Sequence, residues 1–535
     1  MDKQDAIIIG AGLNGLVAAA YLVKSGRRVT IICQGGAGLV DYSDPVPGMD
    51  GIAFETHGGQ NLTLPNSIVW DLGLEALGLR FAPPRSSAVV TGDGVLIRDA
   101  DPTAMDRRLR AWSPREADAY RNFLSLIVRQ RRLLDRYLEQ GWGQKLSRRA
   151  TLKILQDASQ DGMLEAAALY SGSLRDTLDR LFESDLLKMA FLAGALEGPF
   201  SGMGLGPWSP TSGIGLLFDS LSLSGYQSPW PGRRIEGGRR AVVKALQEFI
   251  GAAGGTFIRD TKVTEVVTAK GVAKAVALEG GQYIEASEII ADIDVKRTAF
   301  SLVDWKTLPE DLALGIANIR SRAQVAQVNF VLSDWPNPAA LHDGFLSGGV
   351  LHILQGLEKT ERSFDDWKSG RLSPHCPIQF EVWKEEGKVL ATAFVHFVPG
   401  ALAEGEWDDK TKLALIGQVV KAVAGMAPGF ETTLVDARAV TPIDFEKRFG
   451  LIGGHHQGGE TALDQLLFHR PTPDLSRNYQ IMDSLSFLGL ATPLSPFMDG
   501  MPGYVLARDL IAEPRWPWQT RGEIKAQQSG QGRQS

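Results

Sequence analysis

The sequence has 535 residues, of which 44% are hydrophobic and 22% are charged, so it holds material for two or more globular domains. Its net charge of −6 argues against a general nucleic-acid binder, and no DNA or RNA partner is expected. Two cysteines, Cys33 and Cys376, are too few for a disulfide framework or a thiol-rich metal site. The N-terminus lacks the pattern of a signal peptide, and we expect a cytoplasmic protein.

The first predicted elements are a strand, a glycine turn and a helix. The apolar run Ala6–Ile9 is followed by Gly10, Gly12 and Gly15 and then by small residues typical of a closely packed helix. Gly10 suits a tight turn, Gly12 lets a pyrophosphate approach the backbone, and Gly15 lets the helix pack on its strand. The helix N-terminus offers N–H donors to phosphates. The pattern favours a mononucleotide or dinucleotide site, with a purely structural glycine turn as the alternative.

The next segments predict a second strand, a loop and a hairpin. Residues 28–33 form the strand, and residues 34–59 are polar and rich in turn residues, which is typical of a loop. A short helix over 67–73 continues toward residue 79. Two β-branched runs around Asp93-Gly94 predict a hairpin over 88–97 that begins a second domain.

A capping box, Ser113-Pro114-Arg115-Glu116, predicts a helix that runs to about Gln140. The surrounding segment 103–153 carries thirteen Lys or Arg against five Asp or Glu. One interpretation is a solvated basic face over a core helix. The other is that residues 107–153 contact anionic lipid headgroups or an acidic partner, which would place the protein at the periphery of a membrane.

The pattern of the remaining sequence predicts a mainly antiparallel sheet with helices beside it. Helical patterns extend to residue 197, glycines and prolines mark residues 198–215 as a connection or pocket wall, and a long helix spans 239–253. Strands are predicted over 256–259, 262–268, 273–278, 283–286, 288–292, 329–331, 349–354, 378–383 and 388–398, and a helix over 409–427.

Four motifs resemble the phytoene-desaturase-like branch of the flavin amine oxidase superfamily. They lie at residues 10–21, 237–239 and 292–298, and at 463–466 together with Arg470-Pro471. The resemblance implies an α/β fold, in which a discontinuous Rossmann-type FAD-binding domain carries an inserted α+β substrate domain. The implied FAD-binding segments are 1–82, 225–302 and 441–515; the substrate domain takes 83–224, which is helical and basic, and 303–440; and 516–535 form a disordered tail.

The resemblance implies FAD as cofactor. The implied cofactor-binding residues are Gly10, Gly12, Leu13, Asn14, Gly15, Cys33, Val263, Gly489, Thr492, Gly500, Pro502 and Gly503. Two features depart from the family pattern. Cys33 stands where the family carries an acidic residue for the ribose hydroxyls, and a thiol is a weak hydrogen-bond group. Ser495-Pro496-Phe497 replaces a run of glycines.

No residue pattern identifies a catalytic residue, and no metal site is expected. His455-His456 lacks an accompanying ligand cluster apart from Glu460, which favours a glycine-flanked loop with hydrogen-bonded imidazoles. The leading hypothesis is an FAD-dependent oxidoreductase that acts on an apolar, isoprenoid or lipid-like substrate. The alternative is a family member that has lost catalysis and serves as a binding or partner subunit.

Overall fold

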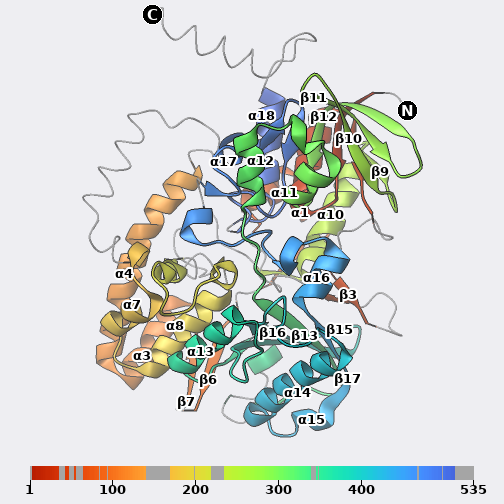
Figure 1. Cartoon of the computed structure of the whole chain (residues 1–535). Helices are drawn as coiled ribbons and strands as arrows, with labels where there is room; N and C mark the ends of the chain where they lie inside the picture. The colour runs from red at the N-terminus through yellow and green to blue at the C-terminus, as the bar shows by residue number, and fades with distance from the viewer. Residues whose placement is uncertain are drawn as a thin grey trace, which may run out of the picture.

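The computed structural model contains two large β-sheets, two short two-stranded sheets and a group of helices beside the second large sheet (Figure 1). It describes residues 3–34, 43–46, 53–55, 64–82, 85–92, 94–99, 101–139, 169–197, 199–217, 234–338, 341, 345–347, 349–466, 469–496 and 498–512, with the side chains of 43–44, 131–139, 197, 199–200, 234, 347 and 477–478 excepted. The first sheet lies in the upper half of Figure 1, and the second sheet lies below.

The first sheet is assembled from three separate parts of the chain. Its eight strands are β1 (Gln4–Ile9), β2 (Val29–Ile32), β9 (Thr256–Ile258), β10 (Val263–Ala269), β11 (Val272–Leu278), β12 (Tyr283–Ala291), β18 (Gln480–Met482) and β19 (Leu485–Phe487). Strands β19, β12, β1, β2 and β9 are parallel neighbours, and Ile9 pairs with both Ala291 and Ile32. The apolar run at the N-terminus therefore forms a central, buried strand, as β-branched residues favour.

Three helices pack against this sheet: α1 (Leu13–Lys24), α10 (Gly238–Ala252) and α18 (Met501–Ala512). Ala18, Ala19 and Ala20 are all fully buried, so small side chains let α1 approach its neighbours closely. A methyl group on Gly503 would overlap the backbone carbonyl oxygen of Asn14. The close contact between α1 and α18 thus depends on a residue without a side chain.

The second sheet has seven strands in the order β17-β13-β16-β15-β14-β6-β7. They are β6 (Ser87–Thr91), β7 (Gly94–Arg98), β13 (Val325–Leu332), β14 (Val350–Ile353), β15 (Ile378–Glu385), β16 (Lys388–His396) and β17 (Leu434–Val440). All pairs are antiparallel except β14 with β6, which confirms the predicted hairpin and the sheet type predicted for the strands from residue 329 on. The strands predicted over 256–292 belong to the first sheet instead, where β9 and β12 have parallel partners. Helix α14 (Asp409–Met426) buries Leu415, Val419 and Val423, which belong to the apolar core of this sheet.

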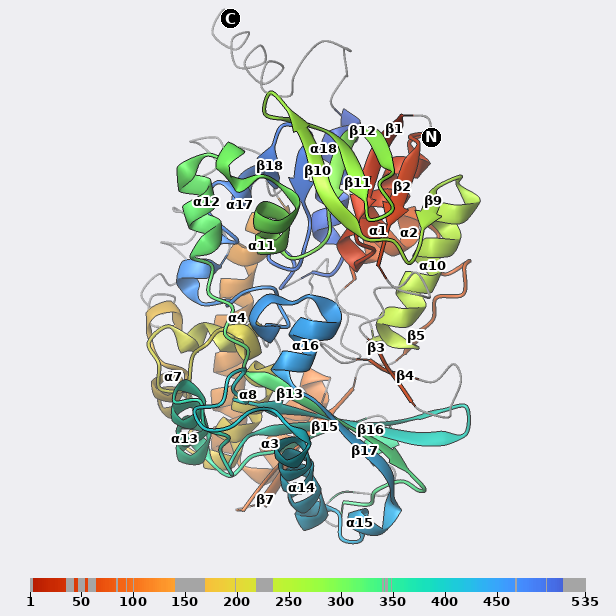
Figure 2. The same cartoon turned by 45° about the vertical axis from the view of Figure 1, so that its right-hand side comes forward.

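The helices beside the second sheet are α3 (Pro102–Trp112), α4 (Pro114–Glu139), α7 (Leu174–Leu181) and α8 (Asp185–Glu197). Shorter elements connect these parts: α2 (Asn66–Asp71), α11 (Val295–Arg297), α12 (Glu310–Ala317), α13 (Leu357–Lys368), α15 (Phe430–Thr433), α16 (Pro442–Phe449), α17 (Leu475–Asn478), β3 (Ser43–Pro45), β4 (Ala53–Glu55), β5 (Phe81–Ala82) and β8 (Arg234–Ile235). Helix α10 extends from the first sheet toward β3 and β4, as Figure 2 shows.

The expected fold class, a Rossmann-type α/β domain with an inserted α+β part, is confirmed. Some local predictions were wrong. The segment predicted as a loop over 34–59 contains the antiparallel pair β3 and β4. The two strands predicted over 283–286 and 288–292 are one strand, β12, because the residues between them continue the ladder.

The predicted capping box is only half formed. The Ser113 hydroxyl accepts the backbone N–H of Glu116 at 3.3 Å, but the Glu116 carboxylate accepts the N–H groups of Glu183 and Ser184 instead of returning to Ser113. A tertiary contact between α4 and the start of α8 has replaced the local one. The predicted disordered tail lies outside the described residues. Within the described part of the chain, no helix combines the length and the apolar character that crossing a bilayer requires.

Candidate dinucleotide site

The glycine turn lies at the carboxyl end of the buried strand β1, where ligands of Rossmann-type sheets bind. Gly10 has φ +94°, a conformation that favours glycine, and Gly12 forms the N-cap of α1 with extended backbone. The N-cap residue Gly12 has no side chain to cap α1, and in the first turn the N–H of Gly15 is accepted by the carboxylate of Asp292. Gly10 and Gly12 also keep partial solvent exposure although they adjoin the core. This arrangement suits an approaching phosphate.

Asp292, which follows β12 directly, faces the same turn and was not among the residues that the sequence indicated. Its carboxylate Oδ2 accepts the backbone N–H of Gly15 at 2.8 Å, and its backbone N–H donates to Ile9 O at 2.8 Å. Burial raises the pKa of Asp292 to about 7, against the opposing effect of hydrogen bonds from Gly15 and Gly12 and of the Arg239 charge. The sequence could have indicated Asp292, because it follows a strand, β12, that ends beside β1 at the same edge of the parallel sheet.

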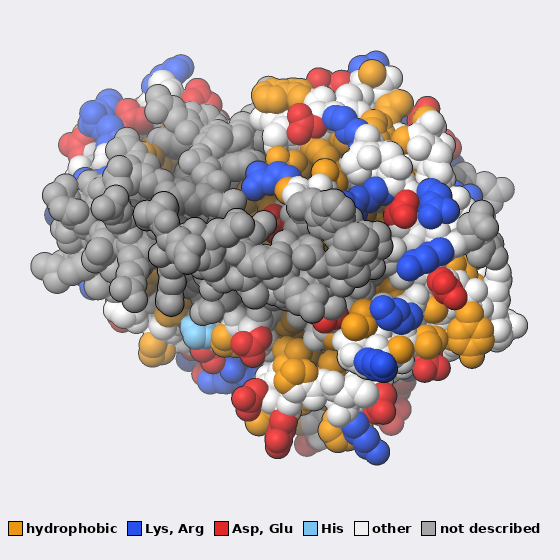
Figure 3. All heavy atoms as spheres, turned by 90° about the horizontal axis from the view of Figure 1, so that it is seen from above, with side chains coloured by type: hydrophobic (Ala, Val, Ile, Leu, Met, Phe, Trp, Pro, Cys, Tyr) orange, Lys and Arg blue, Asp and Glu red, His pale blue; other side chains and the backbone are white. Residues whose placement is uncertain are grey.

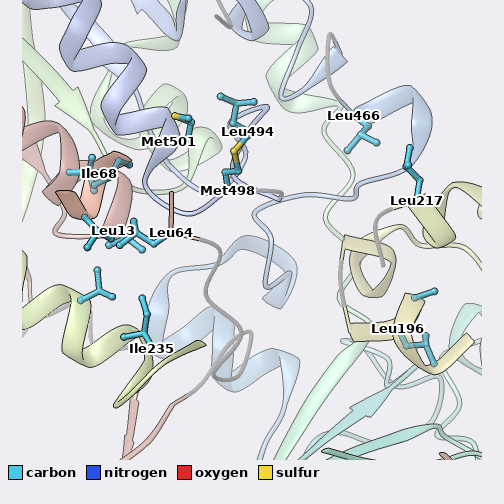
Figure 4. Close-up of a cluster of buried hydrophobic side chains, with 14 of the residues drawn as sticks. Leu13, Leu64, Ile68, Leu196, Leu217, Ile235, Leu466, Leu494, Met498 and Met501 are labelled. Carbon is cyan, nitrogen blue, oxygen red and sulfur yellow. The ribbon is translucent and has the colours of Figure 1, made fainter. Parts of the chain in front are cut away.

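Leu13 and Asn14 begin α1 and are both buried. The Asn14 side chain donates to Leu488 O at 2.9 Å and accepts the backbone N–H of Gly500 at 3.1 Å. Its amide therefore joins the glycine turn to the C-terminal segment. Figure 4 shows Leu13 close to Leu64 and Ile68.

The predicted C-terminal residues surround this junction. A methyl group on Gly489 would overlap the carbonyl oxygen of Ile293, and Gly500 has φ +75°. Pro502 and Gly503 are buried in the first turns of α18. The Thr492 hydroxyl is buried and has no hydrogen-bond partner among the described residues. An unpaired buried hydroxyl favours a ligand at this position, because such groups are normally satisfied.

Cys33 follows β2 at the same carboxyl edge of the sheet as Gly10, whose N–H donates to Ile32 O at 2.8 Å. The Cys33 backbone N–H donates to Ile258 O at 3.0 Å, and its carbonyl accepts the N–H of Thr261, two residues before Val263. The thiol Sγ lies 3.9 Å from Ile258 O, and burial raises its pKa. The structure thus brings the glycines, Asn14 and the C-terminal residues together and places Cys33 one parallel strand away from the glycine turn, with the segment that leads to Val263 bonded to it.

His455 and His456 have the hydrogen-bonded imidazoles that the sequence predicted. His455 Nε2 lies 3.1 Å from Gly202 O, and its Nδ1 accepts backbone N–H groups of Gln457 and Gly459. His456 Nε2 lies 3.0 Å from the Ser201 hydroxyl. Burial lowers the pKa of each histidine to about 3, so both rings are neutral. In the described residues no group of three His, Cys, Asp or Glu is placed to hold a metal ion.

Arg470 is a buried cation beside this loop. Its guanidinium donates to the backbone carbonyls of Thr492, Gly459, Glu460, Gln457 and Leu490. Burial lowers its pKa to about 9. These bonds use the five N–H groups of the side chain, so Arg470 holds two loops together and leaves no donor for a ligand.

Comparisons with known proteins agree with this geometry. Residues 8–72 match the family model of the NAD(P)-binding Rossmann-like domain. The chain is 27% identical to pyridine nucleotide-disulfide oxidoreductase domain-containing protein 2 of Rattus norvegicus, over 89% of this chain and 87% of that protein. It is 23% identical to the zeta-carotene-forming phytoene desaturase of Myxococcus xanthus, over 96% and 94% of the two chains. The chain is thus similar in sequence to phytoene desaturases over most of its length.

This similarity was predicted from the motifs and is confirmed. Solved structures share the fold. An oxidoreductase from Methanosarcina mazei has a TM-score of 0.54 at 15% identity and covers 95% of this chain and 100% of its own. A putrescine oxidase variant has a TM-score of 0.55 at 16% identity, with 95% and 99% covered. The named relatives are oxidoreductases, and they give the non-catalytic alternative no support.

Proposed function

We propose that this chain binds FAD at the glycine turn and is an FAD-dependent oxidoreductase. The observation that carries the proposal is the turn from Gly10 to Gly12 at the end of a central parallel strand, followed by the N-terminus of α1, where the N-cap glycine has no side chain. The unpaired Thr492 hydroxyl adds a second buried group suited to the same ligand. When bound, FAD supplies the electron acceptor for hydride removal.

The residues fit the cofactor in two places. The backbone from Gly10 to Gly15 would hold the pyrophosphate, with Thr492 and Gly489 beside it. Cys33 and Val263 would face the adenosine end. Asn14 and Arg470 keep the C-terminal loops in position through the hydrogen bonds described above.

We further propose a largely apolar substrate that carries at least one polar group. On one face of the second sheet, Val331 and Leu390 are buried in a cluster with Phe54 of β4. The half-buried Trp383 packs against this cluster. On the same strands, Gln327 Nε2 donates to Glu55 O at 2.8 Å, which links the second sheet to β4. Glu55 in turn accepts the N–H of Arg240 at the start of α10.

Polar side chains interrupt this apolar face. Gln327, Asn329 and Thr392 form a hydrogen-bonded group with distances of 2.8–2.9 Å. Gln327 Oε1 is buried and has no partner within the described residues. A hydroxyl or amine donor on the substrate would satisfy this acceptor, whereas a pure hydrocarbon would leave it unpaired at a cost of roughly 1–3 kcal/mol.

The test of FAD binding is the flavin content of the purified protein. Retained oxidised flavin gives a yellow protein, and Gly12→Val should abolish retention because its side chain enters the path of the pyrophosphate. The matched control is Gly417→Ala in α14, where an added methyl group meets nothing within 4 Å. Equal flavin content in Gly12→Val and the unmodified protein would contradict the proposal.

A further inference from the structure

Asp292 places a carboxylate inside the glycine turn that the proposed cofactor would use. The residue is held there by its backbone bond to Ile9 O and by the bond from Gly15 N–H to Oδ2, both 2.8 Å. A methyl group on Gly12 or Gly15 would lie 2.6 or 2.5 Å from Oδ2. The glycines therefore leave room for this carboxyl group as well as for a ligand.

The surroundings offer the Asp292 charge little compensation. Helix α1 has no acidic residue in its first turn. Its basic residue Lys24 lies in the last turn, at the far end of the helix from Asp292. Arg239 at the start of α10 is the charged group that acts on Asp292 electrostatically, and its guanidinium pairs with Asp499 at 3.2 Å. Among the described residues, no ion pair reaches Asp292. An ionised carboxylate here would stand next to a bound pyrophosphate with no cation between them.

We propose that Asp292 is a residue of the dinucleotide site and that the site accepts the pyrophosphate with Asp292 as the neutral carboxylic acid. This inference rests on the proposed FAD binding and deepens it. In the neutral form the carbonyl oxygen keeps the bond from Gly15 N–H, and the hydroxyl can donate to a phosphate oxygen. Above the pKa of the free site, one proton from solvent must enter Asp292 for each dinucleotide that binds.

Burial supports the proton linkage, because it raises the pKa of Asp292 in the empty site to about 7. A second negative charge raises it further, so binding and protonation favour each other. Affinity should then be constant below neutral pH and should fall as pH rises. The slope approaches about tenfold per pH unit, the limit for one linked proton.

The experiment measures FAD affinity of the apoprotein by titration calorimetry between about pH 6 and pH 9, in two buffers with different ionisation enthalpies. We expect affinity to weaken with pH and uptake of about one proton per FAD at alkaline pH. Asp292→Asn should bind with flat pH dependence and no proton uptake, because its amide oxygen can still accept Gly15 N–H. Asp304→Asn is the control, since Asp304 only caps the turn at Lys306, and it should keep the original slope.

The outcomes separate this inference from the proposed function. FAD binding without pH dependence or proton uptake in the unmodified protein overturns the role of Asp292 and leaves FAD binding intact. An equal slope in Asp292→Asn also overturns it. Absence of FAD binding at every pH overturns the proposed function and this inference together. Glu55 of β4, which contacts the start of α10, is a second carboxyl group whose pKa burial raises to about 7, so Glu55→Gln separates the two. If Asp292→Asn does not fold, proton uptake that persists in Glu55→Gln supports Asp292, and uptake that is lost there overturns the inference.

Discussion

His455 and His456 give the chain a pH dependence at the scale of single residues. Both rings are buried and their pKa values lie near 3, whereas an unfolded histidine titrates near its ordinary value. The unfolded chain therefore binds more protons below about pH 6.5, and stability falls as the pH is lowered through that range. The expected loss is roughly 2 kcal/mol per histidine at about pH 5.

Urea unfolding at neutral and acid pH measures this loss. His456→Gln keeps a hydrogen-bonding group near Ser201, whose hydroxyl lies 3.0 Å from His456 Nε2, and removes one titrating ring. It should be less sensitive to acid than the unmodified chain. If the free energy of unfolding falls by the same amount between the two pH values in His456→Gln and in the unmodified chain, His456 does not control acid stability.

Cys33 allows a second test at the residue scale. We expect Cys33→Glu to tighten FAD binding by about 1–2 kcal/mol, because a carboxylate accepts two ribose hydroxyls and a thiol does not. Titration of the apoprotein measures the change, and Cys376→Ser, at a buried position in the second sheet's core, serves as the control. Unchanged or weaker affinity would mean that another residue meets the ribose; Asp260, which acts electrostatically on Cys33, is the candidate.

At the scale of elements, the contact of α1 with α18 is the most constrained packing in the first domain. Gly503→Ala would push a methyl group into Asn14 O and should destabilise the fold by about 2–4 kcal/mol. Gly417→Ala in α14 has free space around the added methyl group and should stabilise by up to about 1 kcal/mol. Thermal unfolding of the two variants distinguishes a packing glycine from a merely flexible one; a stable Gly503→Ala protein would contradict the packing argument.

At the scale of the whole molecule, the basic segment remains the proposed contact with a membrane. Four of its arginines are already paired with acidic neighbours: Arg108 with Asp99, Arg110 with Asp106 and Asp118, Arg115 with Glu183, and Arg121 with Asp106 and Asp118. Figure 3, seen from above, shows acidic and basic side chains interspersed on the visible described surface. Two of these partners, Asp99 and Glu183, lie outside the segment 103–153 and therefore add negative charge that the count of thirteen against five does not include.

The prediction is salt-sensitive cosedimentation with anionic vesicles and none with neutral ones, because screening weakens attraction between exposed charges. Reversing Arg129, Arg131 and Arg132 should weaken it, although the side chains of the last two lie outside the described residues. Reversing Lys410 and Lys421 in the remote helix α14 is the control, and Lys412 of the same helix is left unchanged because it pairs with Asp444. If the protein stays in the supernatant with anionic lipid at low salt, the docking proposal is wrong.

The sequence by itself determined the features that depend on near neighbours in the chain. Strand β1, the glycine turn and α1 follow from an apolar run and from glycine spacing, and the hairpin of β6 and β7 follows from a turn between β-branched runs. These patterns are local, so hydrophobic period and backbone freedom suffice to predict them. The motif resemblance added the fold class, because it joined segments that no local pattern connects.

Only the tertiary structure decided which atoms meet at the site. Gly15 and Asp292 are 277 positions apart, and Asn14 and Gly500 are 486 apart, so no spacing rule could pair them. Glu116 looked like the second half of a capping box, yet its carboxylate binds the start of α8. In each case a buried polar group takes the acceptor or donor that packing brings near it, because an unsatisfied partner would cost more than a lost local bond.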